Sequence, residues 1–225
     1  MIRILSALLL VTSLAQPVAA QVAGSVEFNP FELEGASSNR IFIFDEAYTR
    51  QYGVEVPAPF SLLVPDQPGV ELIADGHPDG GAFLRFTFVT GDPRQFVENI
   101  QVVTATIPML AEAEDPEAAR LQMSVALLRD RVYPVAVEDF DAARILAMEI
   151  FEFNGHMGVQ LIGQYTDPAI GPMLLRLTAH PNPAQPESYV TVANINLALV
   201  PVTDGETLRQ SLSGRVANSL SFTPQ

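Results

Sequence analysis

The stretch that decides the fold runs from residue 143 to residue 166 and reads ARILAMEIFEFNGHMGVQLIGQYT. Two apolar runs, Ala143 to Phe153 and Gly158 to Thr166, are joined here by Asn154-Gly155-His156-Met157. An Asn-Gly pair favours the tight turn of a β-hairpin because both residues tolerate a positive φ. We therefore predict two antiparallel strands that meet at this turn.

Two further strands and a helix follow the hairpin. Met173 to Ala179 is predicted as a strand, and the proline-rich loop His180 to Pro186 separates it from Tyr189 to Val200. The second run is rich in valine and threonine and has no interior proline, which is typical of a central strand. A capping box at Thr203 to Glu206 then predicts one last helix, whose apolar stripe is Leu208, Leu212 and Val216.

A long helix is predicted upstream of the hairpin, starting at Asp115-Pro116. Aspartate is a good helix cap, and proline is favoured at the first helical position. The residues Leu121, Val125, Leu128 and Val132 form one apolar stripe that ends before Pro134. We expect the arginines of this segment to face solvent or the helix C-terminus: Arg120, Arg129 and Arg131.

The first part of the chain carries strand signals. In Ala82 to Thr90, Leu84, Phe86 and Phe88 share one face, as a half-buried strand requires, and Asn99 to Ile107 continues in the same style. Ser25 to Leu33 and Ile41 to Phe44 are two short candidates. The prolines of Tyr52 to Val64 make that segment an edge strand or an irregular entry segment. The whole order predicts an α+β fold with a mostly antiparallel sheet flanked by helices.

The order of elements from Ala143 onward resembles the PsbP-like fold, an α/β/α sandwich around an antiparallel sheet. The shared pattern is two paired strands, a third strand, a long strand, and a terminal helix that runs into Ser219-Leu-Ser-Phe222. The segment YGVEVPAPFSLLVP, Tyr52 to Pro65, is also similar to that group's opening aromatic-glycine strand and proline turn. The resemblance implies a non-catalytic accessory or binding protein, often exported, and it supplies no catalytic motif.

The first twenty residues are predicted to be a cleavable signal peptide. Arg3 precedes the apolar run Ile4 to Leu14, which is shorter than the about 20 residues that a membrane-spanning helix needs. Val18-Ala19-Ala20 provides a cleavage site before Gln21. We expect a periplasmic or secreted protein, with residues 21–225 forming a single globular domain and no membrane insertion after cleavage. An uncleaved membrane anchor is the alternative.

Charge and cysteine content narrow the function classes. Cleavage would leave 11 basic residues, all arginine, against 26 acidic ones, a formal charge of −15. Such a charge repels phosphate backbones, so we expect no nucleic-acid partner; cations and basic protein surfaces suit it better. It also keeps an exported protein soluble. The absence of cysteine excludes disulfides and a thiolate nucleophile.

The loop from Asp75 to Gly81 is the weak candidate for a metal site. Asp75, His77 and Asp79 alternate like the first ligands of a calcium loop, although a histidine replaces an oxygen ligand and Phe86 stands where the bidentate glutamate belongs. Calcium or zinc is the cofactor that these residues would hold. The alternative is a solvent-exposed hairpin loop rich in turn formers.

No motif predicts catalysis. The G-x-S-x-G elbow and glycine-rich phosphate loops are absent from the sequence, and His77, His156 and His180 have no ligand spacing between them. Asn194 and Asn196 share one strand face, where they would line a pocket, contact a partner or lie partly exposed. We therefore expect no enzyme but an accessory or binding protein of unknown protein or small-molecule partner. The alternative is an exported hydrolase or metal-dependent enzyme whose residues are scattered over loops.

Overall fold

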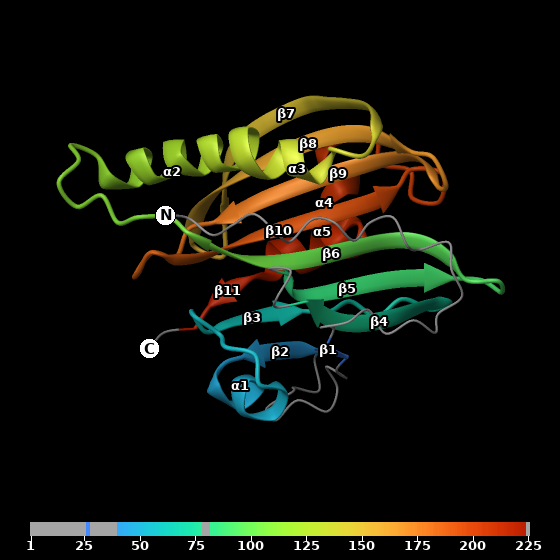
Figure 1. The fold of residues 1–225 in the computed structure, drawn as a ribbon, viewed down its shortest axis with the longest axis horizontal. Helices are drawn as coiled ribbons and strands as arrows, with labels where there is room; N and C mark the ends of the chain where they lie inside the picture. The colour runs from blue at the N-terminus through green and yellow to red at the C-terminus, as the bar shows by residue number, and fades with distance from the viewer. Residues whose placement is uncertain (1–25, 28–39, 78–81, 224–225) are drawn as a thin grey trace.

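The structure is a computed structural model that describes residues 26–27, 40–77 and 82–223 (Figure 1). Its strands are β1 (Val26–Glu27), β2 (Ile41–Phe44), β3 (Phe60–Leu63), β4 (Val70–His77), β5 (Ala82–Thr90), β6 (Gln95–Thr106), β7 (Asp141–Phe153), β8 (His156–Asp167), β9 (Gly171–His180), β10 (Glu187–Asn196) and β11 (Ser221–Phe222). Its helices are α1 (Glu46–Tyr52), α2 (Pro116–Leu127), the π-helical turn η3 (Leu128–Val132), α3 (Tyr133–Ala136), α4 (Gly205–Gln210) and α5 (Leu212–Ser219).

The strands form two sheets. The larger has eight strands in the order β1-β4-β5-β6-β10-β9-β8-β7, and the smaller has three in the order β11-β3-β2. Every described pairing is antiparallel. This confirms the predicted α+β class with a mostly antiparallel sheet, and β10 is the central strand that the sequence indicated.

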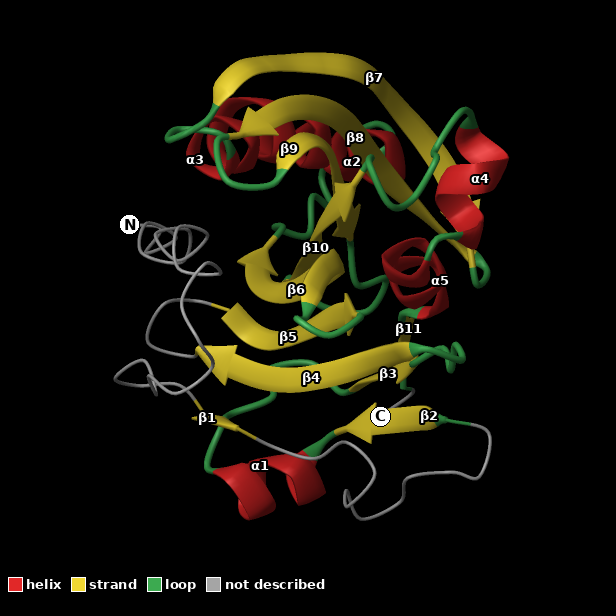
Figure 2. Ribbon diagram, turned by 90° about the vertical axis from the view of Figure 1, so that its right-hand side faces the viewer, coloured by secondary structure: helices red, strands yellow, loops and turns green. Residues whose placement is uncertain are grey.

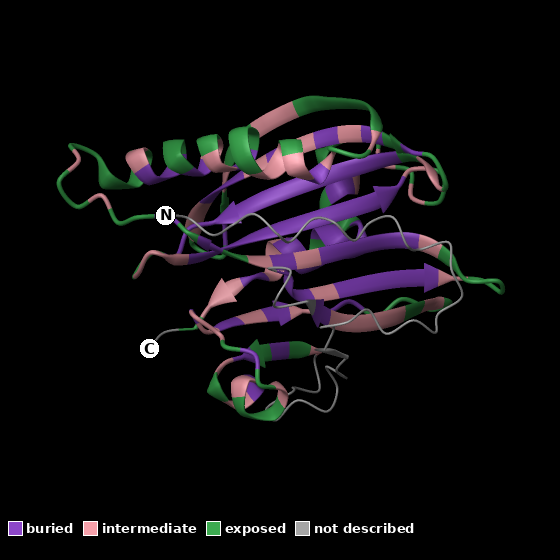
Figure 3. Ribbon diagram, viewed as in Figure 1, coloured by how far each residue is buried: buried purple, intermediate pink, exposed green. Residues whose placement is uncertain are grey.

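The large sheet is covered on both faces, and each face has its own core. On one face, α2, η3 and α3 pack over β8, β9 and β10. On the other, α1, α5 and the small sheet enclose an aromatic core with β5 and β6. The central strands are therefore buried along most of their length (Figure 3). The sheet also curls, so that β7 and β8 form an arch at one end (Figure 2).

Three elements near the N-terminus differ from the prediction. Strand β3 is not at an edge, because it pairs with β2 on one side and β11 on the other. Helix α1 was not predicted, although Asp45 caps it by accepting from the backbone of Ala47 at 2.8 Å. Strand β4 includes Asp75, which the sequence placed in a loop, because it pairs in register with Arg85 of β5. Most of the predicted strand Ser25 to Leu33 lies outside the described residues.

Strand β5 is confirmed over its predicted range, but its second face is also covered. Thr87 and Val89 are buried along with the Leu84, Phe86 and Phe88 face. The predicted half-buried strand is thus a nearly fully buried one, as expected inside a sheet with a layer on either side.

The predicted last helix is two helices. Ser211 has an extended backbone (φ −59°, ψ 160°) and ends α4, and its hydroxyl accepts from the backbone N–H of Gly214 at 3.0 Å to cap α5. A side chain at Gly214 would place its Cβ 2.0 Å from the carbonyl oxygen of Leu208. The corner between α4 and α5 therefore requires glycine at this position.

The buried side chain of Glu98 holds α5 against the large sheet. One carboxylate oxygen accepts from the backbone N–H of Leu212 at 3.1 Å, and the other accepts from the N–H and the hydroxyl of Ser213 at 2.8 and 2.5 Å. A carboxylate suits this place because the first N–H groups of a helix have no partner within the helix. Glu98 thus links strand β6 to the terminal helix.

Candidate functional site

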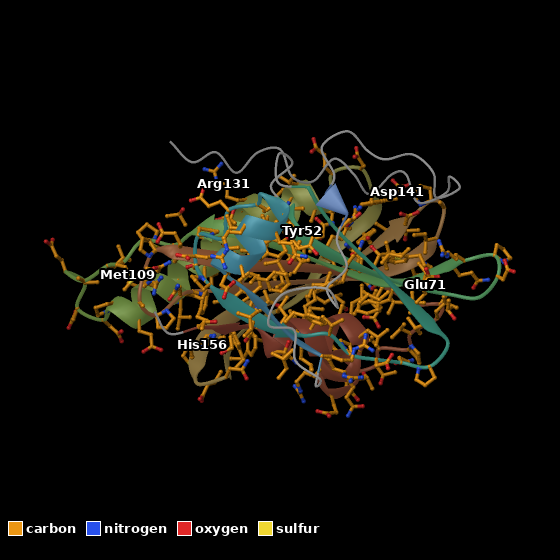
Figure 4. All side chains as sticks on the ribbon, turned by 90° about the horizontal axis from the view of Figure 1, so that it is seen from below. Tyr52, Glu71, Met109, Arg131, Asp141 and His156 are labelled. Carbon is orange, nitrogen blue, oxygen red and sulfur yellow. The ribbon has the colours of Figure 1, made fainter. Side chains whose placement is uncertain are left out.

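A cleft of about 510 Å³ lies where the start of α2 meets the β7–β8 turn. Its volume is within the range of ligand pockets in proteins. Figure 4 shows two of its residues, Met109 and His156, at the same end of the molecule, far from Asp141 at the start of β7. The lining residues are Met109, Pro116, Glu117, Arg120, Leu121, Glu152, Gly155, His156, Met157, Pro181 and Pro183.

The wall formed by α2 is built as the sequence predicted. Asp115 caps the helix by accepting from the backbone of Ala118 at 3.0 Å, and Pro116 and Glu117 occupy the first turn. Leu121 points inward at the cleft. Glu117 of this helix start therefore lines the cleft.

The opposite wall is the predicted hairpin turn. Asn154 and Gly155 have φ values of 47° and 79°, as a two-residue hairpin turn requires. The side chain of Asn154 also donates to the carbonyl oxygens of Asn218 and Leu220 at 3.1 and 3.0 Å. The turn is thereby fixed to the end of α5, which lies on the other face of the sheet from α2.

Arg120 joins α2 to the β9–β10 loop beside the cleft, and here the prediction was wrong. It is buried rather than solvent-facing, and its guanidinium donates to the carbonyl oxygens of Asn182, Ile107 and Gln185 at 2.8, 3.1 and 3.3 Å. Burial lowers the pKa of this guanidinium. Because three carbonyls already occupy the guanidinium, Arg120 positions the β9–β10 loop rather than offering a binding site for an anion.

The free charges of the cleft are negative. Glu117 and Glu152 are exposed at its edge, and within the described part of the chain neither forms a side-chain hydrogen bond or an ion pair. The approach to α2 adds further exposed acids: Glu112, Glu114 and Asp115. The rest of the lining consists largely of methionine, leucine and proline side chains, which favours an apolar group. The cleft thus suits a ligand that joins an apolar group to a cation.

Two of the three histidines come together beside this cleft. The Phe153 ring lies between them, with its centroid 4.3 Å from that of His156 and 4.5 Å from that of His180. Burial lowers the pKa of His156, and it holds the pKa of the fully enclosed His180 well below its ordinary value. His180 contacts the hydroxyl of Thr191 at 3.3 Å. Neither histidine is hydrogen-bonded to a carboxylate among the described residues, so this pair is not arranged as a general base.

A second buried arginine, Arg176, lies near His180 and was not anticipated from the sequence. Its side chain is 1% exposed, and it donates to Gln160 at 3.0 Å and to Asn218 at 2.7 Å. Gln160 in turn donates to Glu149 at 2.8 Å. Burial lowers the pKa of Arg176 to about 10. The amide of Gln160 thus links the buried cation of Arg176 to the exposed carboxylate of Glu149 by hydrogen bonds.

The structure engages Asp75 in an ion pair. Arg85 donates to Asp75 through Nε at 2.7 Å and through a terminal nitrogen. His77 ends β4, and Asp79 lies outside the described residues. No group of three potential ligands is assembled among the residues that the structure describes. Calcium or zinc binding by Asp75, His77 and Asp79 stays a prediction.

Asn194 and Asn196 are buried and belong to hydrogen-bond networks rather than to the cleft. Tyr165 donates to Asn194 at 2.9 Å, and Asn194 donates to Asn99 at 2.9 Å. Asn196 donates to the carbonyl oxygen of Phe96 at 2.9 Å. Buried amides must be satisfied in this way, so their role is structural.

Solved structures similar to this chain include cyanobacterial PsbP from Synechocystis, with 14% identity, 84% of this chain and 96% of that chain covered, and a TM-score of 0.45. The Ran-binding protein Mog1p of Saccharomyces cerevisiae follows with 10% identity, 72% and 89% coverage and a TM-score of 0.35.

A Pseudomonas aeruginosa protein of unknown function matches with 12% identity, 83% and 99% coverage and a TM-score of 0.35. No family model matches the sequence, and no curated protein does. At these identities the likeness concerns the arrangement of elements, so the function is argued from the cleft itself. None of the described helices combines the length and the apolar character needed to cross a bilayer.

Proposed function

We propose that the protein is an exported, non-catalytic binding protein whose cleft holds a basic segment of a partner protein. The observation that carries this is the contrast within the cleft between its apolar lining and two exposed carboxylates, Glu117 and Glu152, that have no side-chain partner among the described residues. An arginine or lysine whose neighbour is apolar would place its cation between these carboxylates. The net charge of the chain favours the same class of partner, because it attracts basic surfaces over a distance of about one Debye length.

The lining also argues against a hydrolase at this place. It contains no serine, threonine or cysteine that would act as a nucleophile, and its histidine, His156, is hydrogen-bonded to no carboxylate within the part of the chain that the structure describes. Covalent catalysis needs a nucleophile within hydrogen-bond reach of a base. Binding is therefore the function that these side chains support.

A labelled peptide tests the proposal. The probe is an eight-residue peptide of alternating leucine and arginine, and its binding to the mature chain is followed by fluorescence anisotropy at low salt. We expect the doubly substituted variant Glu117→Gln/Glu152→Gln to bind about tenfold more weakly, since each partly exposed ion pair contributes about 0.2–1 kcal/mol. The matched control is Glu46→Gln/Glu55→Gln, which removes two exposed carboxylates elsewhere.

Equal affinity of the two double variants would contradict a role for the cleft. A peptide in which glutamate replaces arginine serves as the second control, and its binding as tightly as the basic peptide would contradict the proposed charge preference. Cleavage of the probe during the assay would favour the hydrolase alternative. Each of these outcomes is read from the same titration.

Export is tested by the processed mass. When the full chain is expressed in a bacterium, we expect the protein to be recovered from the periplasm or the medium with Gln21 as its first residue. Recovery of the uncleaved chain from the membrane fraction would instead support an N-terminal anchor.

A further inference from the structure

Strand β7 forms one edge of the large sheet. It spans thirteen residues and pairs with β8 along one side, and no described strand pairs with its other side. Three of its aliphatic side chains are widely exposed: Ile145 at 41%, Leu146 at 48% and Ile150 at 47%. Figure 3 shows β7 as exposed over much of its length. An edge of this kind presents free N–H and C=O groups to which another strand can add.

The sequence of β7 does little to block such pairing. It has neither proline nor lysine, the residues that commonly protect an edge. Its irregularity is confined to the first half, where the register with β8 shifts between Asp141 and Arg144 and again between Ile145 and Ala147. The strand is therefore continuous from Ala147 to Phe153.

The register with β8 tells which β7 side chains share a face. Arg144 and Glu149 lie opposite Gln164 and Gln160, two residues of equal parity, and so project from the same face of the sheet. Ile145 and Met148 lie opposite Gly163 and Leu161 and project from the other face. Arg144 and Glu149 are both exposed, and they carry opposite charges.

This distribution is complementary to itself under a two-fold axis. When two copies of β7 run antiparallel with Arg144 of one copy opposite Glu149 of the other, Ile145 falls opposite Met148, and opposing residues share a face, as antiparallel pairing requires. The axis then passes between Leu146 and Ala147, so the irregular segment from Ile145 to Ala147 of one copy lies opposite the same segment of the other. A shift of two residues would place Arg144 opposite Phe151 and remove both charge pairs.

We propose that the protein forms a symmetric dimer in which two β7 strands pair antiparallel in this register and join the two large sheets into one. Two Arg144–Glu149 ion pairs, one on either side of the axis, select the register, while the backbone pairing and the covered aliphatic side chains hold the copies together. Beyond Arg144, the register shift between Asp141 and Arg144 places Asp141 and Glu152 on opposite faces of the sheet, which limits the pairing to the residues between them. The inference does not depend on the function proposed for the cleft.

The test is the oligomeric state of the mature chain by sedimentation equilibrium at concentrations between about 1 and 100 µM, because the dimer fraction depends on the chain concentration. We expect Arg144→Glu and Glu149→Arg each to raise the dimer dissociation constant at least about tenfold, because each variant sets like charges opposite each other twice. The combined variant Arg144→Glu/Glu149→Arg is expected to return to within about threefold of the wild type, since the reversed pairs re-form. The matched control is Arg131→Glu, an exposed arginine on η3.

Recovery of dimer affinity by the combined variant would be specific to pairing between copies. Within one copy the two residues are five positions apart on a strand, roughly 16 Å, which is too far for an ion pair. Arg144→Gln provides a milder variant if Arg144→Glu disturbs folding, and protection of β7 amides from hydrogen exchange at high concentration reports the paired strand directly.

A chain that is monomeric at every concentration would overturn the proposal and leave the edge to a strand of another protein. A dimer that the single charge reversals do not weaken, or that the combined variant does not restore, would overturn this register.

Discussion

The contact between Glu98 and the start of α5 leads to a prediction whose size follows from the structure. Glu98 is 1% exposed, and its carboxylate accepts three hydrogen bonds from Leu212 and Ser213. Replacement by glutamine keeps the shape but leaves one oxygen and one NH₂ group. Whichever way the amide turns, its NH₂ group faces a backbone N–H, so at least one hydrogen bond is lost and the others are no longer assisted by charge.

The expected loss follows from the strengths of these bonds. A hydrogen bond to a charged group contributes about 1.5–3 kcal/mol and a neutral one about 0.5–1.5 kcal/mol, while the lower cost of burying a neutral group offsets part of the difference. We therefore expect Glu98→Gln to lower the free energy of unfolding by about 3 kcal/mol. For a chain of this length the midpoint of thermal unfolding would fall by roughly 6–12 °C.

The assay is urea unfolding of the mature chain at pH 7, followed by far-UV circular dichroism. The matched control is Glu71→Gln, which removes a carboxylate from the half-exposed ion pair with Arg94 and should change the free energy by less than about 0.5 kcal/mol. If Glu98→Gln proves as stable as this control, the carboxylate does not hold α5, and the reasoning from its three hydrogen bonds is wrong.

Three further predictions concern other buried groups. Gly214→Ala should destabilise the fold by about 2–4 kcal/mol, because its Cβ would meet the carbonyl oxygen of Leu208, whereas Ala126→Gly on the exposed side of α2 should cost only about 1 kcal/mol; thermal unfolding of both variants measures the difference. Arg120→Met should destabilise by about 3 kcal/mol, since it leaves three carbonyl oxygens without their donor, and Arg120→Lys should restore part of the loss; equal stabilities of the two variants would contradict this. Burial, with Arg176 and His156 nearby, holds the pKa of His180 below its ordinary value of 6.5. Below that pH the unfolded chain therefore binds more protons at this residue than the folded chain does. The contribution of His180 to stability is thus present above about pH 6.5 and is lost as the pH drops toward 5. His180→Phe should flatten that slope in urea titrations between pH 7 and 5, and an unchanged slope would assign it to other groups.

Local sequence patterns predicted the second half of the fold well. The Asn154-Gly155 turn, the strands on either side of it and the start of α2 all depend on neighbouring residues, and the structure confirms each. Strand β4 was missed because the glycines and aspartates from Asp75 onward are typical of a loop. That segment is a strand because it pairs with β5. The information that makes it a strand is therefore in the sequence of β5 and not in the residues of β4.

The cleft could be predicted only in pieces. The turn with His156, the loop after His180 and the Asp115-Pro116 start of α2 were each predicted, but their proximity comes from contacts between distant parts of the chain. Arg120 did carry a signal: it precedes Ser124 by four residues and Leu128 by eight, and all three are buried. Helix positions that are four and eight residues apart lie on nearly the same face, so Arg120 faces the core despite its charge. Its guanidinium therefore requires buried hydrogen-bond acceptors in place of water.

The hydrogen-bonded side chains of Tyr165, Asn194 and Asn99 restrict how the strands can align with one another. These three residues come from β8, β10 and β6, and each finds its partner only when all three strands are correctly aligned. Sliding β10 by one residue would turn Asn194 to the opposite face of the sheet and leave Tyr165 and Asn99 unsatisfied. In a molecule without disulfides, these polar groups favour the correct alignment of the strands, because an apolar core alone would accept more than one alignment.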